Sequence, residues 1–222
     1  MRASNICSIS CYSPTMTLGF QPSLLDACDI RLGSLAGLRR ITLSRGAWVD
    51  LLPSWVAGAD ELFTSLVQDI PWRAERREMY DHTVDVPRLL HMYGVGADLP
   101  HPVLAEARDA LSRHYAPELG EPFVTAGCCY YRDGHDSVAW HGDRIGRARN
   151  HDTMVAIVSL GSPRKLLLRP TGGSVEHSFA VGHGDLLVMG GSCQRTWEHA
   201  VPKSASCAGP RISVQFRPRG VR

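Results

Sequence analysis

Ser137-Val138-Ala139-Trp140-His141-Gly142-Asp143 is the stretch of sequence from which the rest of the chain is best understood. Residues i and i+2 of an extended strand point to the same side, so His141 and Asp143 present an imidazole and a carboxylate together. One histidine from a distant strand would complete three ligands on one face of a metal ion, and His199 follows a β-like run far along the chain. We therefore predict that His141, Asp143 and His199 bind a metal whose opposite face stays open.

A second His-x-Asp motif, His183-Gly184-Asp185, competes with the first. Its surroundings, Val-Gly-His-Gly-Asp-Leu-Leu-Val, are typical of a tight turn that enters a strand. Only one short connection separates this motif from His199, whereas a jelly-roll triad takes its two histidines from strands far apart in the sequence. The sequence thus favours His141 and Asp143 as ligands and a turn role for His183.

Short β-rich runs, interrupted by glycine and proline, surround both motifs. Eight such runs with turns between them predict a double-sheet jelly roll (a double-stranded β-helix) in a protein that is mainly β with α (α+β). The expected strands are 123–131, 137–142, 153–160, 164–169, 175–181, 185–189, 195–199 and 211–217.

The first half of the chain has a mixed pattern. Residues 38–43 resemble a strand, whereas residues 48–57, 59–70 and 102–115 carry apolar side chains at helical spacing. We expect residues 1–15 to be a disordered tail and residues 16–222 to form a single domain. Within that domain, residues 16–120 are expected to build an N-terminal extension and lid, and residues 121–218 the jelly-roll core.

Composition sets only loose limits on function. A net charge of +2 over 222 residues neither demands nor excludes a nucleic-acid partner. Seven cysteines without a CxxC pair indicate reduced thiols, which predicts a cytoplasmic protein. No apolar run approaches the length of a membrane helix, so we expect no membrane association. We infer no protein partner and expect a monomer.

The last expected strand, 211–217, alternates strictly between two kinds of side chain. Arginine, serine, glutamine and arginine share one face, and isoleucine, valine and phenylalanine share the other. Two arginines on the inward face of a sheet are costly unless anions meet them. 2-Oxoglutarate has two carboxylates, each of which can accept a bidentate contact from a guanidinium group.

Three segments, 131–143, 159–164 and 183–217, resemble the AlkB family of alkylation-repair dioxygenases, and the resemblance covers about residues 80–218. It implies an iron(II)- and 2-oxoglutarate-dependent dioxygenase that uses dioxygen to remove N-alkyl groups from bases in DNA or RNA, a direct reversal of damage. It also implies that His141, Asp143 and His199 hold iron(II).

The resemblance further implies a cosubstrate site. Arg211 would bind the far carboxylate of 2-oxoglutarate, Arg217 would approach the carboxylate near the metal, and Tyr131 would contact the same molecule. Cys129 and Ser213 stand where the family commonly has asparagine, and both are expected beside the cosubstrate.

Substrate contacts are the part where the chain departs most from the family. Relatives that repair DNA usually carry an acidic residue just after the His-x-Asp motif, whereas residues 144–149 hold three arginines and no acid. Arg144 and Arg147 could therefore meet a nucleic-acid backbone. Residues 85–94 resemble the nucleotide-recognition lid, in which Arg88 could contact phosphate or base and Tyr93 could stack on a flipped base.

Two other functions remain open. The missing acid is compatible with an oxygenase of the same class that acts on a protein side chain or a small metabolite. A catalytically inactive binding module on the same fold is the second alternative, against which the three intact ligands and both arginines argue.

Overall fold

The computed structural model describes residues 29–79, 82–143, 146–205 and 209–221, and it leaves the side chains of residues 77–85 and 147 undescribed. The expected tail, residues 1–15, and Arg144 lie outside the described residues. Among the described residues, no helix is long and apolar enough to cross a membrane.

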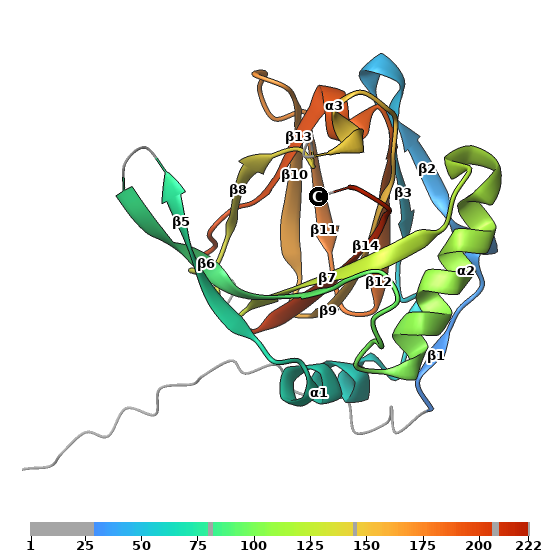
Figure 1. Ribbon diagram of the computed structural model, residues 1–222, viewed down its shortest axis with the longest axis vertical. Helices are drawn as coiled ribbons and strands as arrows, with labels where there is room; N and C mark the ends of the chain where they lie inside the picture. The colour runs from blue at the N-terminus through green and yellow to red at the C-terminus, as the bar shows by residue number, and fades with distance from the viewer. Residues whose placement is uncertain (1–28, 80–81, 144–145, 206–208, 222) are drawn as a thin grey trace, which may run out of the picture.

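Two antiparallel sheets make up most of the fold (Figure 1). The larger sheet has the strand order β2-β3-β12-β9-β14-β7-β6-β5, and the smaller has the order β11-β10-β13-β8. In the larger sheet the strands are β2 (Arg39–Thr42), β3 (Ala47–Leu52), β12 (Asp185–Gly191), β9 (Val155–Gly161), β14 (Arg211–Pro218), β7 (Phe123–Tyr131), β6 (His82–Tyr93) and β5 (Arg73–Met79). In the smaller they are β11 (His177–Val181), β10 (Arg164–Pro170), β13 (Trp197–Val201) and β8 (Val138–His141).

This architecture confirms the predicted jelly roll. Each of the eight strands expected after residue 122 is present, and no end differs from the prediction by more than two residues. Four further strands, β2, β3, β5 and β6, come from the chain before residue 121 and extend the larger sheet at both edges. A short pair, β1 (Arg31–Leu32) and β4 (Val56–Ala57), lies outside both sheets.

Two longer helices cover the outer face of the larger sheet (Figure 1). Helix α1 (Ala59–Asp69) contacts β9, and helix α2 (Pro102–Leu119) contacts β7, where a helix was predicted in each case. His101 caps α2 by accepting a hydrogen bond from the Val103 N–H, and Gly120 ends it in the left-handed conformation. A short helix, α3 (Cys193–Thr196), and three 3-10 turns, η1 (Leu35–Gly37), η2 (Ser44–Gly46) and η3 (Arg147–Arg149), complete the fold.

The alternation in β14 separates two hydrophobic cores. Ile212, Val214 and Phe216 are fully buried between the larger sheet and the two helices. A second core fills the space between the sheets, with Val155 and Leu187 from the larger sheet and Leu168 and Trp197 from the smaller. Because side chains alternate along a strand, residues 211, 213, 215 and 217 face the space between the sheets.

One prediction about the first half was wrong. Residues 48–57 have helical spacing in the sequence but form β3, a turn and β4. Strand β3 is hydrogen-bonded on both sides, to β2 and to β12, so its backbone groups are satisfied in a ladder instead of a helix. Short apolar runs fit either period, and here the tertiary pairing decides.

Candidate active site

The structure brings the three predicted ligands together. His141 ends β8, and the antiparallel register of β8 and β13 places it directly opposite His199. The two imidazole rings lie 4.2 Å apart between centroids. One ligand atom from each of His141, Asp143 and His199 lies within 4.8 Å of the others, the sole cluster of this kind among the described residues.

Hydrogen bonds orient the ligands. Nδ1 of His141 lies 2.9 Å from the carbonyl oxygen of Ala139, which it can donate to, while Nε2 lies 3.8 Å from Oδ1 of Asp143. The backbone N–H of Asp143 donates to Oε1 of Gln194, at 3.1 Å, from the buried side of α3. Gln194 was missed in the sequence, where a glutamine in a short helix carries no recognisable signal.

The charged groups around Asp143 and His199 set protonation states that suit cation binding. Burial alone would raise the pKa of Asp143, but Arg217, whose Nε donates to Oδ2 at 2.7 Å, and the two histidines lower it to about 2. Burial and the neighbouring His141 lower the pKa of His199 to about 3. At neutral pH Asp143 is therefore ionised and His199 is neutral, the protonation states in which these groups bind metals. Two imidazoles and one carboxylate are a donor set that fits iron(II).

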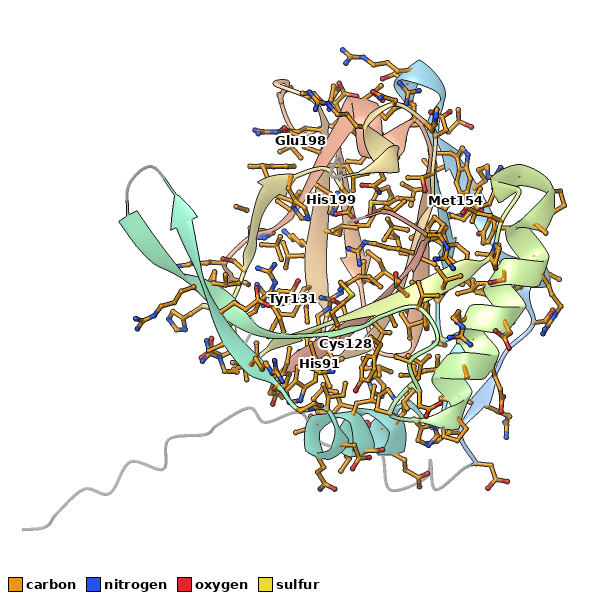
Figure 2. All side chains as sticks on the ribbon, in the orientation of Figure 1. His91, Cys128, Tyr131, Met154, Glu198 and His199 are labelled. Carbon is orange, nitrogen blue, oxygen red and sulfur yellow. The ribbon has the colours of Figure 1, made fainter. Side chains whose placement is uncertain are left out.

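The pocket next to the triad has the inward face of β14 as its floor. Strands β7 and β14 pair so that Tyr131 lies opposite Arg211, Cys129 opposite Ser213 and Thr125 opposite Arg217. Tyr131 on β7 and His199 on β13, both labelled in Figure 2, line the same pocket from opposite sheets. Aliphatic side chains form its walls: Val138, Val155, Ile157, Leu166, Val181, Leu187 and Val201.

Arg211 fits an anionic ligand. Its side chain is 3% exposed, its Nε donates to Oγ of Ser159 at 3.0 Å, and its guanidinium lies 5.1 Å from the centre of the Tyr131 ring. Its Nη1 is buried and has no hydrogen-bond partner among the described residues. A buried donor without a partner is costly, so a carboxylate at this end of the pocket would satisfy it.

Arg164, to which the sequence analysis gave no role, supports the same end of the pocket. This buried side chain donates to the carbonyl oxygens of Asp133, Asp136 and Pro202, at 3.1, 2.8 and 2.6 Å. Its guanidinium also lies 5.4 Å from the Tyr131 ring. Arg164 thereby ties the turn after β7 to the chain after β13 and holds Tyr131 in place.

Cys129 and Ser213, which stand where the family commonly has asparagine, belong to one hydrogen-bond network. The side chain of Gln215 donates to Oγ of Ser213, and its Oε1 lies 3.7 Å from the Cys129 thiol, which donates to it. The backbone of Gly127 leaves room for this amide, since a Cβ there would lie 3.1 Å from Oε1 of Gln215 and 3.0 Å from Nη1 of Arg217. Cys129 and Ser213 therefore both line the pocket through a shared partner.

The second His-x-Asp motif has the expected turn role. Nδ1 of His183 accepts a hydrogen bond from the Gly161 N–H at 2.7 Å, and Nε2 lies 3.1 Å from Oδ1 of Asp60. Asp185 accepts hydrogen bonds from the N–H groups of Ser54 and Gly182. These contacts join α1, β9 and the turn before β12.

Known proteins place this site in a family. Residues 91–217 match the family profile of the 2OG-Fe(II) oxygenase superfamily. An alpha-ketoglutarate-dependent dioxygenase alkB homolog 3 from Bos taurus is 31% identical over 84% of this chain and 70% of its own length. The chain belongs to the AlkB family. It is an iron(II)- and 2-oxoglutarate-dependent dioxygenase, which consumes dioxygen.

Other AlkB relatives agree with this placement. The Homo sapiens alpha-ketoglutarate-dependent dioxygenase alkB homolog 3 is 30% identical over 90% of this chain and 76% of its own length. A DNA oxidative demethylase ALKBH2 from Arabidopsis thaliana is 32% identical over 52% of this chain and 43% of its own length. The solved structure of OsALKBH1 shares the fold, with a TM-score of 0.57 and 16% identity, and covers 82% of this chain and 100% of its own.

Two of the predicted substrate residues of this AlkB-family chain, Arg88 and Tyr93, have described side chains, and of these Arg88 reaches the pocket. Arg88 lines the pocket from β6, and its Nη1 donates to the carbonyl oxygen of Ser137 at 3.1 Å. Tyr93 pairs with Ala126 and packs on the helix-covered core, on the opposite face of the sheet. Arg144 and the side chain of Arg147 lie outside what the structure describes.

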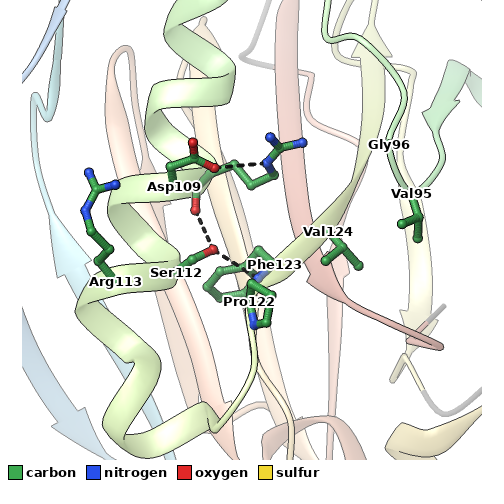
Figure 3. A pocket seen from close by; sticks show the side chains of 9 residues that line it. Val95, Gly96, Asp109, Ser112, Arg113, Pro122, Phe123 and Val124 are labelled. Atoms are coloured by element: carbon green, nitrogen blue, oxygen red, sulfur yellow. Dashed lines mark hydrogen bonds and ion pairs between the residues drawn. The ribbon is translucent and has the colours of Figure 1, made fainter.

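A larger hollow, of about 430 Å³, lies between α2 and the start of β7 (Figure 3). Arg108 and Asp109 pair with each other there at 3.4 Å, and Ser112 accepts a hydrogen bond from the Phe123 N–H. No histidine or cysteine is among the described residues that line it, and Asp109 is the one carboxylate among them.

Proposed function

We propose that this dioxygenase oxidatively dealkylates N-alkylated bases in DNA or RNA and so reverses alkylation damage directly. The observation that carries the proposal is a pocket lined by both histidines of the His-Asp-His cluster and by a buried arginine, Arg211, whose Nη1 has no partner among the described residues. Relatives named as DNA oxidative demethylases support the nucleic-acid substrate. The three free cysteines among the described residues agree with a reducing cytoplasm, where we place the activity.

In this proposal His141, Asp143 and His199 hold iron(II). The bound iron supplies the oxidation of the alkyl carbon at the expense of dioxygen and 2-oxoglutarate, which is converted to succinate and carbon dioxide. Arg217 keeps Asp143 ionised, and Gln194 fixes the backbone from which the carboxylate extends. These residues prepare the ligand set before iron arrives, which lowers the cost of ordering it.

The cosubstrate lies over β14 in the same proposal. Arg211 binds its far carboxylate with the Nη1 donor that lacks a partner, and Tyr131 flanks the contact. Arg217 lies at the metal end, and Cys129 and Ser213 line the stretch between. The aliphatic walls exclude water from the reacting atoms, which strengthens each charged contact inside the pocket.

Residues 16–222 act as one domain in this proposal, and the protein works as a monomer on a nucleic acid. Arg88 approaches the alkylated base from β6, and Arg144 and Arg147 meet the backbone of the strand. Tyr93 has no part in base binding, because the sheet separates it from the pocket.

The test is succinate formation with iron(II), ascorbate and air, with and without a single-stranded oligonucleotide that carries one N-methylated base. We expect the oligonucleotide to stimulate succinate formation and to lose its methyl group, as measured by mass spectrometry. His141→Ala should abolish both, whereas His135→Ala, at a side chain that is 93% exposed, should change neither. Succinate formation without stimulation by any methylated base would point to a protein or metabolite substrate, and none at all in iron-loaded protein would point to a binding module.

A further inference from the structure

The charges around the pocket are unbalanced. Its described lining carries three guanidinium groups, from Arg88, Arg211 and Arg217, and no carboxylate. The carboxylate of Asp143, which joins the triad beside this lining, already accepts a hydrogen bond from Arg217. Iron(II) and 2-oxoglutarate carry opposite charges of equal size, so their binding leaves the positive excess unchanged.

Among the described residues, Arg88 is the lining arginine that this arrangement leaves without a counter-ion. Arg217 is bound to Asp143, and Arg211 lies at the end of the pocket that suits a carboxylate of the cosubstrate. Arg88 donates from Nη1 to the Ser137 carbonyl, and its Nε is buried without a hydrogen-bond partner among the described residues. Ser137 directly precedes β8, so Arg88 is anchored at the start of the strand that ends at His141, in the same pocket lining as that histidine.

The sequence directly after Asp143 is basic. Residues 144–149 contain arginine at three of six positions and no acid. No residue of this run can supply a carboxylate to pair with a positively charged base.

N-Alkylated bases fall into two electrostatic classes. Methylation at N1 of adenine or N3 of cytosine produces a cation, whereas methylation at N1 of guanine or N3 of thymine leaves a neutral base with a carbonyl oxygen beside the alkylated nitrogen. A guanidinium group has only donors, so it can bond to that carbonyl but repels a cationic ring. We infer that this pocket selects neutral N-alkylated bases over cationic ones, with Arg88 as the residue that discriminates between them.

This inference rests on the proposed dealkylation and is tested with a matched pair of substrates. 3-Methylthymine and 3-methylcytosine carry the same methyl group at N3 and differ in charge, in the group at C4 and in the C5 methyl group of thymine. In the same single-stranded oligonucleotide, we expect iron-loaded enzyme to demethylate 3-methylthymine about tenfold faster or more, the size of effect that one charge-assisted hydrogen bond provides.

Substitutions at Arg88 test whether this residue causes the preference for the neutral base. Arg88→Gln should bring the two rates close together, Arg88→Lys should keep the preference for 3-methylthymine, and Arg31→Gln, at an exposed residue of β1, should leave the ratio unchanged. Thermal unfolding of each variant confirms that it folds.

Anaerobic binding, followed by fluorescence anisotropy of the two oligonucleotides, should show the same order of affinity without turnover. Faster reaction or tighter binding of the cationic base in the wild type, or a ratio that Arg88→Gln leaves intact, would overturn the inference while the dealkylation itself stands. If the enzyme demethylated neither of these pyrimidines and neither of the purines 1-methylguanine and 1-methyladenine, the proposed dealkylation would be wrong as well.

Discussion

Asp143 shows how much a single residue depends on its neighbours. Its carboxylate accepts a hydrogen bond from Arg217, its backbone N–H donates to Gln194, and His141 lies within 3.8 Å. A buried carboxylate without such partners would take up a proton and lose its value as a ligand. The residue is therefore ready to bind a cation because of contacts that lie 51 and 74 positions away in the sequence.

Replacement of Arg211 by glutamine tests the cosubstrate site at this scale. We expect Arg211→Gln to weaken 2-oxoglutarate binding about tenfold to a hundredfold, because one charge-assisted contact to the far carboxylate is lost. Isothermal titration of the Mn²⁺-loaded protein under nitrogen measures the effect. With 2-oxobutyrate, which lacks the far carboxylate, the variant and the wild type should bind alike, and an equal loss for both keto acids would contradict this role.

At the scale of elements, short α3 couples the two strands that carry ligands. It follows β12, leads directly into β13 with His199, and sends the buried side chain of Gln194 to the backbone of Asp143 beyond β8. The helix therefore fixes the spacing between both parts of the metal cluster.

Gln194→Leu removes this coupling and leaves the Asp143 N–H without its acceptor. We expect the affinity for Mn²⁺ to fall about tenfold to a hundredfold, the usual effect of removing a group that orients a ligand. Electron paramagnetic resonance of free Mn²⁺ measures it. Gln194→Glu keeps the acceptor oxygen and should retain more affinity, and Arg195→Gln on the same helix should have no effect; unchanged binding in Gln194→Leu would exclude the coupling.

A second coupling joins β2, β3 and α2. Asp50 on β3 is 3% exposed and accepts two hydrogen bonds from Arg40 and one from the hydroxyl of Tyr115, at 2.8, 2.7 and 2.9 Å. This buried carboxylate holds the helix against the edge of the larger sheet.

Asp50→Ala should lower the free energy of unfolding by about 2–3 kcal/mol, because it leaves the buried Tyr115 hydroxyl without its acceptor and removes one of the two counter-ions of Arg40, the other being Glu118. Urea unfolding followed by circular dichroism measures the change. Asp109→Asn on the exposed side of α2 should change stability by less than about 0.5 kcal/mol. A cost for Asp50→Ala as small as that of the control would show that the network contributes nothing.

The whole molecule buries Asp143 and His199, and this has a consequence for stability in acid. The folded pKa of His199, about 3, is below its ordinary value of 6.5, so the unfolded chain binds a proton that the folded chain excludes. The folded pKa of Asp143, about 2, is below 3.8, and its contribution is likewise present above 3.8 and lost toward pH 2. Both groups make the metal-free fold less stable as the pH falls.

Metal-free protein should therefore lose stability progressively as the pH falls from about 6.5 to 3, by a few kcal/mol in total from His199. Guanidinium unfolding at a series of pH values measures this slope. His199→Gln should flatten it within that window, whereas His135→Gln, at a fully hydrated position, should not. A slope that is the same in both variants would show that His199 does not titrate with folding.

Local pattern in the sequence determined the strands after residue 122, the two longer helices and the three residues of the metal cluster. Strand alternation and the i, i+2 rule act between neighbours, so they can be seen without a fold. The face of β14 that carries Arg211 and Arg217 was visible for the same reason.

Only the tertiary structure decided that residues 48–57 form strands, that Tyr93 faces away from the pocket while Arg88 faces into it, and that Gln194 and Arg164 support the site. Each of these depends on partners distant in the sequence: a ladder on both sides of β3, the register of β6 on β7, and hydrogen bonds across turns. Such contacts leave no periodic signal, because their energy comes from burial and pairing that exist only after the sheets have closed on each other.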